Sequence, residues 1–369
     1  MDIGSDNNMD VLFNPVSVAI IGITRKSGPG SYNLMENMLN YGYQGKIFPV
    51  NYQAKEILGQ KAYSNVKDVK QKIDLAIIIL PRELVPKCIL ECAESGVKAV
   101  IVVGQGFADV GVRGKELQRE IVKIAKDKGI RILGPNTLGV VNNFNNFTTS
   151  FMPLNKEKAP IGLICQSGIF FVGARNFIGN VGKGIDIGNA CDIGFYESLK
   201  YFGEDPDIKI IAAHMEGLEQ GRRFLSLASH IAREKPIVIF KTGQSEKGAK
   251  DAASHSGTMA GHYQIYRAAL KHAGVHFLDE DGQMVDAVKS LLHLPTMKGN
   301  RVAVITPTGA GGIMVSDALE RYRLKMASLS ETTIKQIAAL SPEWMPLANP
   351  LDIWPAAMKH KLKDVYAIA

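Results

Sequence analysis

The stretch SVAIIGITRKSGPG (Ser17–Gly30) is an apolar run that ends in a glycine-rich turn. Its first part is apolar without alternation, which is typical of a strand buried on both faces in a parallel sheet. The glycines that follow allow a tight turn into a helix. A strand, a glycine turn and a helix in this order predict the first unit of a Rossmann-like domain.

Similar units follow along the chain. Four more apolar runs alternate with helix-like segments: GKIFPVN (45–51), DLAIIIL (74–80), VKAVIVVG (97–104) and GIRILG (129–134). Five strand–helix units in order predict a doubly wound α/β domain. We expect this first domain to span residues 1–140.

A second series predicts a second doubly wound, flavodoxin-like domain over residues 141–296. Its strands are expected in IGLICQSG, KGIDIG, IKIIAAHMEG and KPIVIFKTG, each ending at glycine or a polar turn. A third domain, residues 297–369, starts with the strand and turn of NRVAVITPTGAGG. One clear strand–helix unit is little for an independent domain, so we expect this part to be incomplete or to need a partner.

Composition narrows the class of protein. Of the 369 residues, 46% are hydrophobic and 21% charged, and the net charge is +7. No block of like charges occurs, so we expect no nucleic acid partner. A mild basic excess suits a small polyanion such as a nucleotide, although a solvated surface explains it equally well.

The start of the chain, MDIGSDNNMD, is polar and acidic, so we expect no signal peptide and a cytoplasmic protein. No apolar run approaches the ~20 residues of a membrane helix. The four cysteines form no CxxC pair and are expected to be reduced. His272 and His276 are separated by Gly274, so no metal site is expected.

The first glycine turn could hold an anion. After a strand, such a turn directs backbone N–H groups and a helix dipole at one point, and Arg25 and Lys26 add positive charge. A turn required only for packing is the alternative. The spacing departs from GxGxxG, and Asn51 stands where a dinucleotide site has an acid for the ribose. This disfavours NAD and a dehydrogenase but leaves a phosphate-bearing ligand open.

The second turn, Gln166–Gly168, also joins a strand to a helix and could present N–H groups to an anion. Ser167 is better interpreted as an N-cap than as a nucleophile, because Cys165 replaces the first glycine of GxSxG. Glu216 follows another strand and is expected at the same carboxyl edge, where α/β ligands bind. A solvated turn residue is the alternative for Glu216.

His255 lies among small and hydroxyl residues in KDAASHSGTMAGHY (250–263). A lone histidine is more often structural, but these surroundings would let a phosphorylated partner approach. A phosphoryl-accepting histidine needs one free ring nitrogen and an acceptor for the other. Glu216 could be that acceptor, and Gln166–Gly168 could face the new charge.

Together these motifs resemble the α-subunit-type chains of the NDP-forming acyl-CoA synthetases, which include ADP-forming acetate–CoA ligase and are related to succinyl-CoA synthetase. The resemblance spans nearly the whole chain. It rests on the order of SVAIIGITRKSGPGSYNLMENML, GKIFPVN, GVKAVIVVGQGF, RILGPNTLGVVN, ICQSGIF, GNACDI, MEGLEQGRRF and SHSGTMAG.

The resemblance implies a coenzyme A site in the first domain. The residues it assigns to this site are Gly22, Thr24, Arg25, Lys26, Gly28, Gly30, Asn51, Pro81, Val103, Gly104 and Gln105. It further implies that His255 is phosphorylated, that Glu216 orients it, and that Gln166, Ser167 and Gly168 bind phosphate.

The implied reaction converts acyl-CoA, ADP and phosphate into a carboxylic acid, CoA and ATP, through an acyl phosphate and a phosphohistidine. ATP or ADP with Mg²⁺ would bind an ATP-grasp β-type subunit or domain, on a partner chain or beyond Ala369, since we find no such domain here. An oligomer is expected. The alternative is a non-catalytic CoA-binding regulatory or scaffold module.

Overall fold

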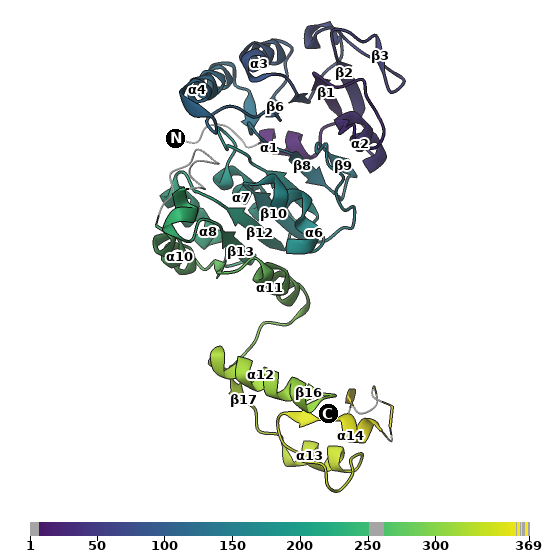
Figure 1. Cartoon of the computed structure of the whole chain (residues 1–369), viewed down its shortest axis with the longest axis vertical. Coiled ribbons are helices and arrows are strands. Elements are labelled where there is room, and N and C mark those ends of the chain that lie inside the picture. Colours follow the sequence, from purple (N-terminus) through teal and green to yellow (C-terminus); the bar gives the residue numbers. More distant parts are fainter. Residues whose placement is uncertain (1–6, 251–261, 359, 362, 364–365, 368–369) are drawn as a thin grey trace. The chain divides into compact units, whose positions relative to one another are not determined.

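The computed structural model describes residues 7–250, 262–358, 360–361, 363 and 366–367. The chain forms two compact units, Met1–Leu294 and Pro295–Ala369. The first unit contains both large sheets, and Figure 1 shows the elements of each unit along the sequence.

The first sheet has five parallel strands in the order β2-β1-β5-β6-β7. They are β1 (Ser17–Ile21), β2 (Lys46–Val50), β5 (Leu75–Ile78), β6 (Ala99–Val102) and β7 (Arg131–Leu133). All five predicted strands are therefore confirmed. β1, β5 and β6 are buried along their whole length, as expected of a sheet covered on both faces.

The strand order reverses direction beside β1. The chain places β2 on one side of β1 and then crosses to place β5 on the other. Ligands of open α/β sheets bind outside the carboxyl ends of the strands at such a point. The crossover helices are α2 (Leu34–Tyr41), α3 (Val85–Glu94) and α4 (Gly111–Lys128), and β3 (Glu56–Ile57) and β4 (Gln60–Lys61) form a small hairpin.

The second sheet has seven strands in the order β14-β13-β12-β10-β11-β8-β9. They are β8 (Gly139–Asn142), β9 (Phe147–Thr148), β10 (Ile161–Cys165), β11 (Lys183–Asp186), β12 (Ile210–Met215), β13 (Ile237–Lys241) and β14 (His276–Leu278). β10 to β14 pair in parallel, which confirms the flavodoxin-like prediction.

An antiparallel extension of this sheet was missed. β8 pairs antiparallel with β11, and β9 pairs antiparallel with β8. β8 includes residue 140, at which the sequence predicted the end of the first domain. The run GVVN is short and follows a turn, so no long apolar pattern distinguishes it from a loop, and its pairing with β9 and β11 makes it a strand.

Helices cover both faces of the second sheet. They are α5 (Gly168–Val172), α6 (Ala174–Phe177), α7 (Phe195–Glu204), α8 (Gly221–Ile231), α10 (Tyr263–His272) and α11 (Gly282–His293). Met284 and Val288 of α11 pack in one hydrophobic cluster, and Phe224 of α8 packs in another. The cluster that contains Phe224 also contains Ile20 of the first sheet and Phe13 of α1 (Asn7–Phe13). The two sheets therefore share a core.

The second unit has two short parallel strand pairs: β15 (Arg301–Val302) with β17 (Lys325–Met326), and β16 (Ile305–Thr306) with β18 (Leu351–Asp352). Its helices are α12 (Gly309–Arg321), α13 (Glu331–Ala338) and α14 (Trp354–Ala357). A small cluster around Ile337 and Ile353 forms its core. Among the described residues of the whole chain, no helix has the length and hydropathy needed to cross a bilayer.

Candidate functional site

The structure brings Glu216 and Gln166 together at the carboxyl edge of the second sheet. Gln166 directly follows β10 and Glu216 directly follows β12, which are neighbouring strands. The Oε1 atom of Gln166 accepts the backbone N–H groups of Glu216 and Gly217 at 2.9 and 3.0 Å. Glu216 is only 8% exposed. The side chain of Gln166 therefore shapes the Glu216 turn, a role that the sequence did not indicate.

Ser167 and Gly168 start the short helix α5. Ser167 has the extended backbone of an N-cap residue, but its hydroxyl makes no capping hydrogen bond. A Cβ atom at Gly168 would lie 3.0 Å from Leu138 and 3.9 Å from Oδ2 of Asp186, so this helix start is closely packed. α5 has five residues and meets α6 at Gly173.

Asp186, which the sequence analysis missed, is buried at the end of β11. Its Oδ2 accepts the N–H of Leu138 at 2.8 Å and its Oδ1 accepts that of Gly188 at 3.3 Å. Burial raises the pKa of Asp186 to about 7, although these hydrogen bonds oppose the shift, and the Glu216 carboxylate adds to it. The signal available in the sequence was the one used for Glu216, an acid at the carboxyl end of an apolar strand.

A cavity of about 80 Å³ opens beside Gln166. The residues that line it include Cys191, Asp192, Phe195, Gly217, Leu218 and Gln220. They come from the turn before α7 and the turn after Glu216, so the cavity lies at the same edge of the sheet as the predicted phosphate residues.

His255 lies outside the described residues. The described chain on either side of it meets the Glu216 turn. Thr242, which follows β13, donates its N–H to the carbonyl of Met215 at 3.0 Å. Tyr266 of α10 accepts the N–H of Leu218 through its hydroxyl at 3.1 Å. Both elements that flank the histidine segment are thus anchored next to Glu216.

In the first domain, Gly22 makes a contact that only glycine permits. Its φ is +84°, and a Cβ atom there would lie 2.3 Å from the carbonyl oxygen of Ile79. The turn after β1 can therefore pass directly over the end of β5. Arg25 and Lys26 are exposed in this turn and make no ion pair within the described part of the chain.

The rest of the turn is held by its own helix. The N–H of Gly28 donates to the Glu36 carboxylate at 2.8 Å, and the Asn33 amide donates to the carbonyls of Thr24 and Lys26. Asn33 also caps α2 by accepting the N–H of Glu36. The Gly28 N–H is therefore occupied by a carboxylate, and the positive charge offered by the turn comes from Arg25 and Lys26. The spacing Asn33-x-x-Glu36, a capping pattern, was the signal that was missed.

Asn51 links the end of β2 to the same turn. Its amide donates to the carbonyl of Ile23 at 2.8 Å, and its Oδ1 accepts the N–H of Gln53 at 2.8 Å. Both ends of the side chain thus bond to the backbone. Asn51 therefore fixes the conformation of the backbone between the end of β2 and the turn after β1, which is a different role from binding a ribose.

The remaining predicted CoA residues lie at the ends of β5 and β6. Pro81 follows β5, and a Cβ atom at Gly104 would lie 3.2 Å from the carbonyl of Leu80. Val103 donates its N–H to Ile78, and Gln105 is exposed. The predicted CoA residues, of which Gly22 is the first and Gln105 the last in the chain, therefore lie at one edge of the first sheet, at the point where the strand order reverses. Gly30, at the end of the first turn, has a φ of +79°.

Comparison with known proteins shows which family the chain belongs to. Residues 16–143 match the CoA binding domain, and residues 158–291 match the succinyl-CoA ligase like flavodoxin domain. The alpha subunit of ADP-forming acetate–CoA ligase II from Pyrococcus furiosus is 36% identical over 349 residues, covering 94% of this chain and 76% of that subunit. This chain belongs to the NDP-forming acyl-CoA synthetase family.

Other members of the family differ from this chain in length. ADP-forming acetate–CoA ligase II of Archaeoglobus fulgidus is 39% identical, over 93% of this chain but only 52% of that protein. The chain thus spans about half the length of that relative. The solved structure of acetyl-coenzyme A synthetase 1 from Ca. Korarchaeum cryptofilum, in complex with phosphate and ADP, matches with a TM-score of 0.86 and 33% identity, covering 94% of this chain and 75% of that one.

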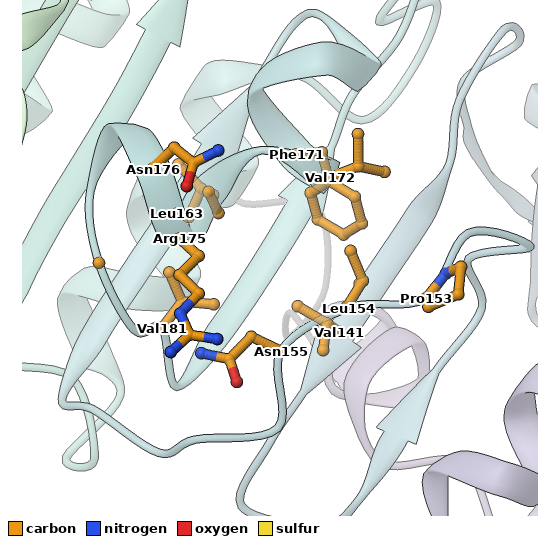
Figure 2. Close-up of a pocket in the computed structure, with 12 residues that line it drawn as sticks. Val141, Pro153, Leu154, Asn155, Leu163, Phe171, Val172, Arg175, Asn176 and Val181 are labelled. Atoms are coloured by element: carbon orange, nitrogen blue, oxygen red, sulfur yellow. The ribbon is translucent and has the colours of Figure 1, made fainter.

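A larger cavity, of about 390 Å³, lies elsewhere in the chain (Figure 2). Leu163 and Phe171 contribute apolar walls, and Arg175 and Asn155 lie at its border. It is also lined by Leu154 and Val181, from the segments that lead into β10 and β11. No predicted site residue lines it, so it is separate from the edge that carries Glu216.

No group of three or more His, Cys, Asp or Glu side chains that could hold a metal is found among the residues that the structure describes. Cys88, Cys92 and Cys165 are buried, and all four cysteines of the chain are free thiols.

Proposed function

We propose that this chain carries the CoA site and the phosphorylated histidine of an ADP-forming acyl-CoA ligase. Phosphate attacks the thioester carbonyl of acyl-CoA, the CoA thiolate leaves, and an acyl phosphate forms. His255 takes the phosphoryl group and the carboxylate of the acid leaves. His255 then passes the phosphoryl group to ADP, which becomes ATP.

The observation that carries this proposal is the meeting of Glu216 and Gln166 at one edge of the second sheet. A histidine that accepts a phosphoryl group needs an acceptor that fixes its tautomer. Glu216 is an acid at this edge, and β13 and α10 lead from the Glu216 turn into the segment that contains His255. Gln166, Ser167 and Gly168 would receive the phosphate.

The edge of the first sheet supports the CoA part of the proposal. Arg25 and Lys26 lie in the turn where the strand order reverses, which is where a ligand with phosphate groups would bind. The match of residues 16–143 to a CoA binding domain agrees with this placement.

The proposal also includes a nucleotide-binding partner. Relatives of this chain are named alpha subunits, which implies another subunit or domain. We propose that an ATP-grasp β-type subunit or domain binds ATP or ADP with Mg²⁺, that a small carboxylic acid is the acyl substrate, that the assembly is an oligomer, and that it acts in the cytoplasm.

The test is labelling of the complete enzyme, this chain with its nucleotide-binding half, by ATP labelled at the γ-phosphate. We expect an acid-labile, base-stable phosphohistidine in the wild type and none in His255→Ala, with CoA affinity unchanged. His230→Ala replaces a histidine at the end of α8 and should keep the label. ATP-dependent ligation of acid to CoA by His255→Ala would refute the mechanism. CoA binding with no label in the wild type would favour the non-catalytic module.

A further inference from the structure

Lys241 is a buried lysine that the proposed reaction does not use. It is the last residue of β13, pairs with Met215 across the sheet, and is 1% exposed. Transfer of an ammonium group out of water is costly, and lysines are almost never fully buried without partners. Burial lowers the pKa of Lys241, while the nearby Glu216 carboxylate acts against that shift. A buried cation at this position therefore calls for an explanation.

The ammonium group has three donors, and hydrogen bonds to backbone carbonyls use two of them. Nζ donates to the carbonyl oxygen of Glu216 at 2.9 Å and to that of Thr242 at 2.9 Å. The ring of Tyr266 covers the remaining side, with its centroid 4.7 Å from Nζ. With its donors used in this way, Lys241 is suited to holding backbone rather than to binding phosphate.

The two carbonyls belong to segments with different tasks. Glu216 begins the turn after β12, and Thr242 begins the chain that runs from β13 toward His255. One ammonium group therefore bonds both the Glu216 turn and the first residue of the histidine-bearing connection.

Two other side chains bind the same turn. Gln166 accepts the N–H groups of Glu216 and Gly217, and Tyr266 accepts that of Leu218. The turn 216–218 is thus held from β10, β13 and α10 at once. Loops that carry functional side chains need such support, because a displacement of about 1 Å can cost up to 10²-fold in rate.

We propose that Lys241 is a positioning residue for phosphoryl transfer, which holds the Glu216 turn and the connection to His255 in a fixed mutual geometry. This inference rests on the proposed function. Lys241 touches no reacting atom; it acts through the backbone of Glu216 and Thr242. Tyr266 assists by covering the ammonium group and binding Leu218.

The chain offers a matched control at the other end of the same strand. Lys235 precedes β13, and its Nζ donates to the carbonyls of Phe202 and Asp205 at 3.1 and 2.6 Å. Burial lowers its pKa as well. Lys235→Met therefore removes the same kind of bonds as Lys241→Met, away from the Glu216 turn.

The first measurement is the rate of phosphohistidine formation in the complete enzyme. Lys241→Met is expected to lower this rate by about tenfold or more while the KM for ATP and the affinity for CoA stay unchanged. Lys235→Met should lower thermal stability but keep the rate. Lys241→Arg keeps a cation with several donors and should recover part of the rate. Equal rate losses in Lys241→Met and Lys235→Met would overturn the proposal.

The second measurement does not depend on activity. Hydrogen exchange of the backbone amides of Glu216, Gly217 and Leu218 should accelerate in Lys241→Met and not in Lys235→Met. Unchanged exchange in Lys241→Met overturns the proposed positioning role of Lys241, whether or not the wild type forms a phosphohistidine. The absence of a phosphohistidine in the wild type would separately refute the proposed function. If Lys241→Met fails to fold, the same measurement is made on Lys241→Gln, which replaces the ammonium group by a shorter neutral amide, and unchanged exchange at Glu216 and Gly217 in that variant likewise overturns the proposal.

Discussion

The Oδ2 atom of Asp186 accepts the backbone N–H of Leu138 at 2.8 Å and so ties the end of β11 to the chain that leaves the first sheet. The carboxyl group is 1% exposed, and its Oδ1 also accepts the N–H of Gly188. Backbone hydrogen bonds hold both oxygens, while burial makes the ionised form costly.

A pH dependence of stability follows from Asp186. Burial raises its pKa from 3.8 to about 7, so between these values the folded chain keeps a proton that the unfolded chain has lost. Stability should therefore fall as the pH rises through this window. Asp186→Asn cannot titrate, so relative to the wild type its unfolding free energy should improve by about 2–3 kcal/mol from about pH 5 to about pH 8. Chemical denaturation at both pH values measures this difference.

The control for that experiment is Asp279→Asn. The hydrogen-bonded guanidinium of Arg267, which is partly buried, holds the pKa of Asp279 below its usual value, which is the opposite shift. No improvement with rising pH is expected there. A parallel response of the wild type and Asp186→Asn would contradict the prediction.

The buried ion pair of Lys183 and Asp205 should be costly to break from one side. Nζ and Oδ2 lie 2.6 Å apart, and both side chains are less than a tenth exposed. Lys183→Met leaves a buried carboxylate with its cation removed, so we expect a loss of about 3–5 kcal/mol in unfolding free energy. Lys183→Met with Asp205→Leu should recover most of it. The exposed pair Lys123–Asp127 is the control, and Lys123→Met should leave the unfolding free energy nearly unchanged, because water screens this pair.

Alanine substitutions at Gly22 and Gly59 distinguish the destabilisation caused by steric contact from that caused by backbone strain. Both have positive φ, +84° and +74°, but only Gly22 would place a Cβ atom against the backbone of Ile79, while Gly59 has open space. We expect Gly22→Ala to destabilise the chain by about 1–3 kcal/mol more than Gly59→Ala and to weaken CoA binding. Thermal unfolding and a CoA titration of both variants test this, and equal effects would argue against the close approach.

Arg25 and Lys26 should contribute charge to CoA binding. Both are exposed, so Arg25→Gln or Lys26→Gln is expected to raise the Kd for CoA by about 2–5-fold at low salt, with a smaller effect at high salt. Lys46→Gln changes the charge equally at the amino end of β2, the opposite edge of the sheet, and should leave the Kd unchanged. Isothermal titration at two salt concentrations distinguishes the variants. Equal effects of Lys46→Gln and Arg25→Gln would show that only net charge matters.

The parts of the fold that could be predicted have a local signature. Runs such as SVAII and LAII have no polar face, so they fit only a sheet covered on both sides, and all five strands of the first sheet form as expected. The strand GVVN (Gly139–Asn142) has no such signature. Its antiparallel place beside β11 depends on residues more than 40 positions away.

The candidate site likewise has residues that could be predicted from local sequence and residues that could not. Glu216 and Gln166 were predictable, because each follows a buried strand and the carboxyl ends of parallel strands meet at one edge. Asp186 carries the same signal as Glu216, an acid at the end of an apolar strand, whereas Lys241 ends a strand as an ordinary polar residue. Their burial and partners depend on which strands become neighbours.

The sequence by itself determined the order of strands and helices, the edge of each sheet where ligands could bind, and the family resemblance, because these depend on local patterns along the chain. Only the tertiary structure decided that Gln166, Lys241 and Tyr266 converge on the three-residue turn at Glu216. The physical reason is that hydrogen bonds between side chains and distant backbone depend on strand neighbours and helix packing, which no local pattern specifies.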